Sequence, residues 1–289
     1  MQGCFSEAFI LTPGRRCNIA VSDAGQKIVI RGGGDLATGV VQKFYRAGFR
    51  VAILEKHEPT AIRRSVALCE AVYNGFFQVE DISCRKITGL DELESCWQNG
   101  IVPLLVDPAG DSIPTIRPAA VIDAIIAKRN LGTNRTMADI TIALGPGFCA
   151  GEDVDIVIET TRGHDLGRLI LQGYTKENTG IPGEIGGQSV QRVLHAPASG
   201  TVLHHKRIGD IVEQGELVLM VEQAPVNASI GGLLRGLIHE GMQVQKGMKV
   251  ADIDPRMDVD WRSISDKARC IGGSALEAYF YIQKRKGEV

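Results

Sequence analysis

The sequence lacks paired cysteines, long apolar runs and a strong net charge. Its seven cysteines are scattered, with no Cys-x-x-Cys pair and no Cys/His cluster, so neither a disulfide framework nor a metal site is predicted. No apolar run approaches the roughly 20 residues of a membrane span, and residues 1–26 lack the regions of a signal peptide. A net charge of −2 gives no basic footprint for nucleic acid or an anionic membrane. We therefore expect a cytoplasmic protein.

Residues 27–55 have the pattern of a βαβ unit. The apolar strand 27–31 is interrupted by glycines 32–34, and residues 35–47 follow with helical apolar spacing. Gly48 is a typical helix stop, and a second apolar strand then ends on Glu55. This order is typical of dinucleotide-binding domains.

The glycines of this unit have distinct predicted roles. Gly32 permits the tight turn off the strand, Gly34 lets backbone approach a phosphate, and Ala37 keeps the helix close to the sheet. Glu55, about 20 residues on, stands where an acid accepts from ribose hydroxyls. The cofactor-binding candidates of this unit are Gly32, Gly33, Gly34, Asp35, Ala37, Thr38 and Glu55.

A second group of candidates follows later elements. Arg63 and Arg64 lie on a helix expected over 60–72, either as anion contacts or as a solvated pair. The turn of Gly145, Pro146 and Gly147 follows a strand expected over 138–144, and its backbone could line a ligand. The strand 155–159 precedes two further binding candidates, Arg162 and His164. Cys149, with His164 as partner, is a weak nucleophile candidate, and plain packing is the alternative.

The strands up to residue 192 alternate with helices or short turns, including a helix expected over 118–129. At 289 residues, 44% of them hydrophobic, the chain is long enough for two domains with cores. We therefore predict an α/β fold, with a Rossmann-like, doubly wound, mostly parallel sheet over 27–192.

Residues 193–256 contain an internal repeat with an offset of 32 residues. Gly200, Gly209 and Gly215 recur as Gly232, Gly241 and Gly247. This half resembles the barrel-sandwich hybrid of the biotinyl/lipoyl class, whose connecting hairpin carries a modified lysine. Here the connection 222–228 is short and has no lysine, so covalent biotin or lipoate is not expected. We predict an inserted structural or docking module, an extension over 1–26, and a C-terminal helix within 257–289 that returns to the α/β domain.

The chain as a whole, over about 27–280, resembles the YqeB-type accessory proteins of selenium-dependent molybdenum hydroxylase systems. These are related in role to the XdhC/CoxI maturation factors. The motifs that carry the resemblance are residues 30–39, 62–67, 143–148, 159–168, 179–187 and 265–269.

The resemblance implies a maturation factor that handles molybdopterin, the molybdenum cofactor, in a Rossmann-like domain. Its partners would be the molybdenum hydroxylase apo-enzyme and other maturation factors, and a homo-oligomer stays open. If sulfur or selenium is transferred to the cofactor, Cys149 is the natural candidate. Two alternatives remain: an NAD(P)-dependent oxidoreductase that uses Glu55 on the ribose, and a non-catalytic docking protein that acts through the repeat module.

Overall fold

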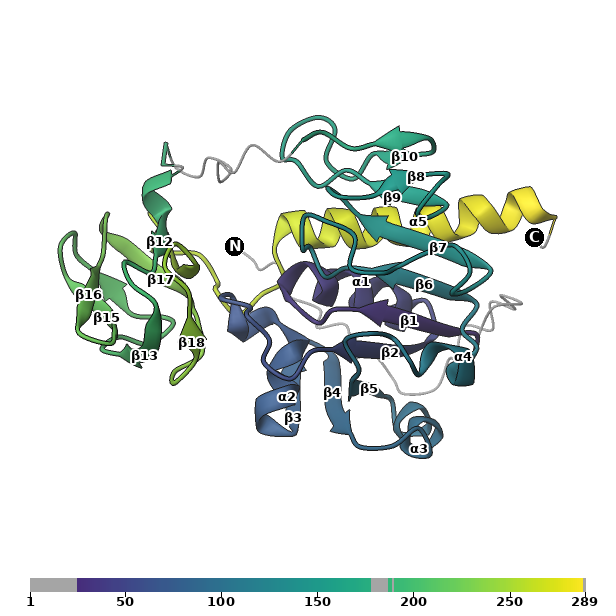
Figure 1. The fold of residues 1–289 in the computed structure, drawn as a ribbon, viewed down its shortest axis with the longest axis horizontal. Helices are drawn as coiled ribbons and strands as arrows, with labels where there is room; N and C mark the ends of the chain where they lie inside the picture. Colours follow the sequence, from purple (N-terminus) through teal and green to yellow (C-terminus); the bar gives the residue numbers. More distant parts are fainter. Residues whose placement is uncertain (1–24, 178–186, 189, 288–289) are drawn as a thin grey trace, which may run out of the picture.

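The computed structural model describes residues 25–177, 187–188 and 190–287. The predicted extension up to residue 24 and the glycine-rich motif up to residue 186 lie outside the described residues. The described chain forms two lobes, a larger α/β body and a smaller β module of residues 193–254 (Figure 1).

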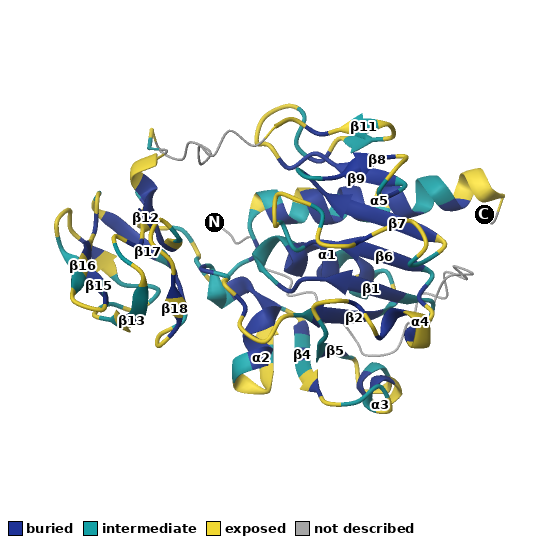
Figure 2. Ribbon diagram, in the orientation of Figure 1, coloured by how far each residue is buried: buried dark blue, intermediate teal, exposed yellow. Residues whose placement is uncertain are grey.

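The α/β body is built on a nine-stranded sheet of order β10-β9-β7-β6-β1-β2-β5-β4-β3. Strands β9 to β4 run parallel, and β10 and β3 add antiparallel edges. The central strands are buried on both faces, as their uninterrupted apolar sequences require (Figure 2). The strands are β1 (Lys27–Arg31), β2 (Arg50–Glu55), β3 (Phe76–Val79), β4 (Ile82–Ile87), β5 (Ile101–Val106), β6 (Ala120–Asp123), β7 (Ile140–Leu144), β9 (Ile156–Ile158) and β10 (Leu169–Ile170).

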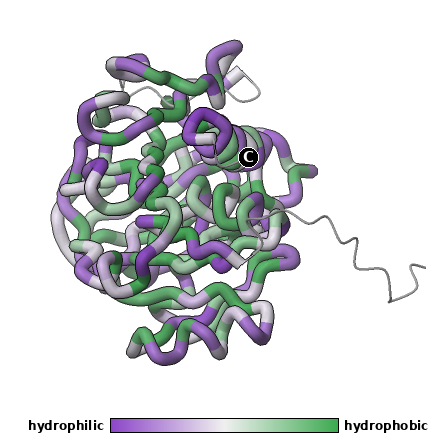
Figure 3. Tube along the Cα trace, turned by 90° about the vertical axis from the view of Figure 1, so that its right-hand side faces the viewer, coloured by the Kyte–Doolittle hydropathy of each residue, from purple (hydrophilic) through white to green (hydrophobic). Residues whose placement is uncertain are grey.

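Two long helices, α1 (Asp35–Arg46) and α5 (Asp266–Lys286), pack on one face of this sheet. The other face is covered by the shorter helices α3 (Glu92–Gln98) and α4 (Ile113–Ile116). Figure 3 shows hydrophobic segments, in green, running through the interior of the molecule. In the described part of the chain, no helix combines the length and the apolar character needed to cross a membrane.

The prediction of a Rossmann-like, doubly wound sheet is wrong. The expected helix 118–129 contains β6, a central strand next to β1, and the chain passes from β6 to β7 and from β7 to β9 without a helix. The expected helix 60–72 is a series of short turns, η1 (Arg64–Val66) and η2 (Leu68–Glu70), before α2 (Ala71–Asn74). The fold is α/β with a large mixed sheet, in which α5 covers the face that crossover helices would have covered.

The β module consists of two four-stranded sheets, β12-β19-β17-β14 and β16-β15-β13-β18, around a core of its own. The 32-residue repeat is visible in the structure: β13 pairs with β18 as β17 pairs with β14, and Gly200 and Gly232 adopt positive φ angles of 151° and 154°. The strands are β12 (Val193–His195), β13 (Gly200–His204), β14 (Ile211–Val212), β15 (Leu217–Val221), β16 (Ala224–Asn227), β17 (Gly232–Leu237), β18 (Gln243–Val244) and β19 (Lys249–Asp254).

The prediction of an inserted barrel-sandwich hybrid of the biotinyl/lipoyl type is also wrong. The segment 222–228, expected to be a connecting hairpin of that class, contains β16, which is hydrogen-bonded to β15 over Ala224–Asn227. The module is therefore described only as two antiparallel sheets.

The β module contacts the α/β body at residues 62–73. The N–H of Leu237 donates to the carbonyl of Ile62 at 2.7 Å, and Arg64 Nε donates to the carbonyl of Leu237 at 2.7 Å. Tyr73 and His239 stack with ring centroids 4.1 Å apart. Beyond the module, α5 begins at the N-cap Ser265, whose hydroxyl accepts from the N–H of Ala268, and it packs along α1.

Candidate functional site

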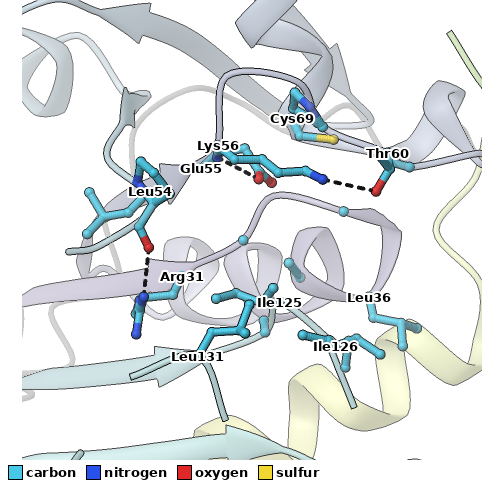
Figure 4. A pocket seen from close by; sticks show the side chains of 18 of the residues that line it. Arg31, Leu36, Leu54, Glu55, Lys56, Thr60, Cys69, Ile125, Ile126 and Leu131 are labelled. Carbon is cyan, nitrogen blue, oxygen red and sulfur yellow. Dashed lines mark hydrogen bonds between the residues drawn. The ribbon is translucent and has the colours of Figure 1, made fainter. Parts of the chain in front are cut away.

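A cavity of about 430 Å³ lies at the carboxyl ends of β1, β2 and β6, beside the N-terminus of α1 (Figure 4). Parallel α/β sheets bind ligands at this edge, and the volume is typical of small-molecule sites. We call it the loop cavity. Its lining residues are Arg31, Gly32, Gly34, Asp35, Leu36, Ala37, Leu54, Glu55, Lys56, Pro59, Thr60, Ala61, Cys69, Pro108, Ala124, Ile125, Ile126, Ala127 and Leu131.

The glycine turn shapes one wall of the loop cavity. Gly32 has a φ of +95°, and its N–H donates to the carbonyl of Leu54 at 2.7 Å. A Cβ at Gly32 would lie 3.0 Å from the carbonyl oxygen of Ala124, whereas a Cβ at Gly34 would meet no atom within 4 Å. Gly32 is thus required by the backbone, and Gly34 leaves open space beside the cavity.

The carboxylate of Glu55 lies at this turn. Its Oε2 accepts from the N–H of Gly33 at 2.8 Å, and its Oε1 accepts from the N–H of Lys56 at 2.8 Å. Burial raises the pKa of Glu55, while the hydrogen bonds from Lys56 and Gly33 oppose that rise. The carboxylate of Glu55 therefore already accepts from the Gly33 N–H, which would donate to a phosphate in the usual binding of a dinucleotide.

Of the other residues predicted in this unit, two line the loop cavity and one holds neighbouring segments of the chain together. Asp35 and Ala37 line the cavity. Thr38 is fully buried: its hydroxyl donates to the carbonyl of Gly34 at 2.9 Å and accepts from the N–H of Leu68 at 3.0 Å. Thr38 therefore joins α1 to the segment that follows β2.

Beneath the cavity, a buried polar cluster joins β1 to β6. Arg31 donates to the hydroxyl of Thr133 and, through Nη2, to the carbonyl of Pro108 at 2.8 Å. Asp123 Oδ2 accepts from Thr133 at 2.5 Å and lies 3.9 Å from Arg31 Nη1. Burial raises the pKa of Asp123, and the hydrogen bond from Thr133 opposes that rise. The cluster fixes the strand ends that carry the glycine turn.

The two predicted arginines of residues 60–72 have different surroundings. Arg63 Nη1 lies 3.6 Å from Asp35 Oδ2, and Arg63 lines a second cavity together with Arg162. Arg64 instead donates to Leu237 and, at 3.2 Å, to Glu70. Arg64 therefore attaches the β module and faces neither cavity.

The remaining predicted residues lie away from both cavities. A Cβ at Gly145 would lie 2.5 Å from Thr175 Oγ1, and one at Gly147 would lie 2.5 Å from the backbone nitrogen of Arg129, so this turn packs against protein. Cys149 is buried in β8 (Cys149–Ala150), which pairs with β11 (Gly173–Tyr174). His164 is exposed, and no contact joins it to Cys149 within the described residues.

Several lining residues were not among the sequence candidates. Ile125, Ile126 and Leu131 form the apolar wall opposite Glu55 and Lys56 in Figure 4. Ile125 and Ile126 belong to the stretch 118–129 for which a helix was expected, and Leu131 follows it, so their approach to the glycine turn was not predicted. Cys69 also lines the cavity, and burial raises the pKa of its thiol well above the usual range, so it is held as a thiol and not as a thiolate. Across the described ranges, no group of three or more His, Cys, Asp or Glu side chains is placed to hold a metal ion.

No protein-family model matches the chain. Several solved structures resemble it at low TM-score. They include the apo ectoine utilization protein EutE (DoeB) from Ruegeria pomeroyi (10% identity, 80% of this chain, 86% of that chain, TM-score 0.24). Two further structures are similarly distant. One is an aspartoacylase family protein from Mesorhizobium loti (10% identity, 80% of this chain, 84% of that chain, TM-score 0.25). The other is a succinylglutamate desuccinylase from Silicibacter (14% identity, 80% of this chain, 85% of that chain, TM-score 0.23). TM-scores this low define no shared fold.

The sequence of the chain is similar to that of a curated protein, the uncharacterized protein YqeB of Escherichia coli K12. The two are 46% identical over 258 residues, which are 89% of this chain and 48% of YqeB. The chain thus spans about half the length of this relative. Over that length the chain is a homologue of YqeB, which supports a YqeB-type family.

Proposed function

We propose that this chain binds molybdopterin, or its dinucleotide form, in the loop cavity and delivers it to the apo-enzyme of a selenium-dependent molybdenum hydroxylase. The role is that of a cytoplasmic maturation factor which works with other such factors. The family resemblance suggests the cofactor, and the homology to YqeB supports the family. The observation that carries the proposal is a partly buried carboxylate facing an apolar wall in a cavity of about 430 Å³.

The residues of the loop cavity fit a pterin. A pterin presents an amino group beside a ring N–H, and a carboxylate can accept from both at once. Glu55 already accepts one hydrogen bond on each oxygen, which leaves further acceptor capacity on both. Ile125, Ile126 and Leu131 offer the apolar surface against which a flat ring would lie. Glu55 would thus hold and orient the ring, and the bound group would bring the molybdenum chemistry.

The experiment that tests this proposal uses Gly34→Val. A Cβ at this position would meet no protein atom within 4 Å, so the variant should fold while its side chain narrows the edge of the cavity. Gly273→Val, on α5, is the matched control, because a Cβ there also meets no atom within 4 Å but lies outside the cavity. Both variants and the parent chain would be purified from cells that make molybdenum cofactor and examined by native mass spectrometry.

A pterin mass on the parent and on Gly273→Val, lost in Gly34→Val, is the expected result. A parent chain that carries no pterin, or a pterin retained equally by both variants, would reject the proposal. The oxidoreductase alternative needs a proton donor placed over a nicotinamide. It has less support, because the side chains that the sequence offers for this role, His57, His164 and Tyr174, do not line the loop cavity. A chain that carries no pterin but still co-purifies with a hydroxylase would favour docking through the β module.

A further inference from the structure

A second cavity, of about 250 Å³, lies between the two lobes. It is bounded by the N-termini of α1 and α5, by residues 62–63, and by the sheet that contains β19 and β17. We call it the basic cavity, because six of its lining side chains are cationic. They are Arg63, Arg162, Arg192, Arg235, Lys249 and Lys267.

Carboxylates neutralise part of this charge. Arg162 donates to both oxygens of Asp266, at 2.9 and 3.1 Å. Asp252 accepts from Arg192 at 2.9 Å and from Arg235 Nε at 2.9 Å. These contacts fix the orientation of three guanidinium groups around the cavity.

The remaining cations are less well compensated. Within the described residues, the ammonium groups of Lys249 and Lys267 make no hydrogen bond or ion pair. Arg63 has only its 3.6 Å contact with Asp35, and its buried Nε meets no acceptor. Desolvation lowers the pKa of Arg63 and Lys267, which are partly buried, and also that of Lys249, whose side chain remains exposed to solvent; nearby carboxylates act in the opposite direction. The fold thus places several like charges around one cavity, and an anion bound there would offset their mutual repulsion.

We propose that the basic cavity binds a phosphate or diphosphate group. Guanidinium forks and ammonium groups are the side chains that bind such tetrahedral anions, and the N-termini of two long helices add partial positive charge. The volume equals that of about eight water molecules, which suits the anion and not a whole nucleotide. The chain as a whole carries a net charge of −2, so the positive charge of this cavity comes from the way the fold gathers these side chains.

This site is separate from the glycine turn, where Glu55 already occupies the N–H of Gly33. The two cavities share Asp35 and Leu36, so they are neighbours at the start of α1. The anion would also contact both lobes, because Lys249 belongs to the β module and Lys267 to α5. Binding is therefore expected to strengthen the attachment of the β module. The inference stands whether or not a pterin fills the loop cavity.

The test is isothermal titration of the full chain with pyrophosphate and, separately, with ADP, which carries the same group on a nucleoside. The double variant Lys249→Gln/Lys267→Gln removes the two uncompensated charges. Its control is Lys246→Gln/Lys284→Gln, which changes exposed lysines on the same module and the same helix outside the cavity. We expect the parent and the control to bind at least one probe one-to-one, and the double variant to bind it at least tenfold more weakly.

Thermal unfolding distinguishes a specific loss of ligand binding from a loss of folding. Without ligand, the double variant should unfold no lower than the parent, because it loses repulsive charges. Pyrophosphate should raise the unfolding temperature of the parent and of the control, and should raise that of the double variant much less. The probe that binds more tightly identifies the source of the group. Absence of binding by both probes, or equal binding by the double variant, would overturn the inference. Gly34→Val should bind pyrophosphate normally, so failure of the pterin proposal and failure of this one are distinguishable.

Discussion

The carboxylate of Glu55 accepts a hydrogen bond from the backbone N–H of Gly33, with 2.8 Å between oxygen and nitrogen. The two residues are the acid and the middle glycine of one βαβ unit, and in dinucleotide binding they would contact ribose and phosphate separately. Because of this direct contact, the glycine turn supports a partly buried carboxylate instead of offering its N–H to a phosphate. At this edge of the sheet, the carboxylate of Glu55 therefore favours a ligand that presents two neighbouring N–H donors.

The first prediction concerns Glu55→Gln. The glutamine oxygen can still accept from one backbone N–H, so the chain should fold. A hydrogen bond to a charged group contributes about 1.5–3 kcal/mol, so the variant should retain at least tenfold less pterin. Retention would be measured as fluorescence after acid–iodine oxidation, per mole of purified protein.

The control for this variant is Glu58→Gln, an exposed acid in the same turn that does not line the cavity. It should retain as much pterin as the parent. Equal retention by Glu55→Gln and the parent would show that the carboxylate does not hold the ring.

The first βαβ unit could be predicted from sequence because its signals are local. The strand, the glycines and the helix stop lie within thirty residues, and each has its own backbone requirement, such as the positive φ of Gly32. The direct bond between Glu55 and Gly33 was not predicted, since it depends on a side-chain rotamer. Thr38 was expected to contact ligand, but its position in α1 turns it toward Leu68.

Strand β6 and the basic cavity show where sequence reasoning fails. A strand buried on both faces has no polar alternation, so Val121 and Ile122 fitted a helical face equally well. The cationic side chains that line the basic cavity are spread along the sequence from Arg63 to Lys267. They come together only because the β module and α5 pack against α1. Each of these side chains alone is typical of an exposed cation.

The second prediction concerns the crossing of α1 and α5. A Cβ at Gly272 would lie 2.2 Å from the carbonyl oxygen of Gly39, so Gly272→Ala must push the helices apart. Overpacking of this kind costs about 1–3 kcal/mol, which should appear as a lower midpoint in urea unfolding followed by circular dichroism. Gly273→Ala is the control, and it should be neutral or stabilise by up to ~1 kcal/mol through helix propensity. An unchanged midpoint for Gly272→Ala would contradict the close crossing.

The third prediction concerns the buried pair Arg31 and Asp123. Both side chains are almost fully buried, so Asp123→Ala leaves the guanidinium without its carboxylate. Removal of one partner of a buried pair costs about 3–5 kcal/mol, measurable by urea unfolding. The double variant Arg31→Met/Asp123→Ala should be less destabilised than Asp123→Ala alone. If the two substitutions simply add, the pair is not coupled.

The fourth prediction concerns the pH dependence of the β module. His204 Nε2 lies 2.8 Å from the carbonyl oxygen of Ile238, and burial lowers the pKa of His204, which the contact with Ile238 and the charge of Glu240 only partly oppose. The unfolded chain titrates this group near pH ~6.5. Below that pH the unfolded state binds more protons than the folded state, so stability falls on acidification until the lower folded pKa is passed.

The measurement is the unfolding temperature between pH 8 and 5 for the parent, His204→Gln and His205→Gln. The glutamine amide can donate to the carbonyl of Ile238 as the imidazole does, but it does not titrate, so His204→Gln should lose part of the acid-side decrease. His205 is the exposed neighbour on the same strand end, and its replacement should leave the profile of the parent intact. Identical profiles for His204→Gln and the parent would mean that His204 gains its proton as easily in the folded module as in the unfolded chain. In that case the contact with Ile238 would be stabilising the imidazolium against burial.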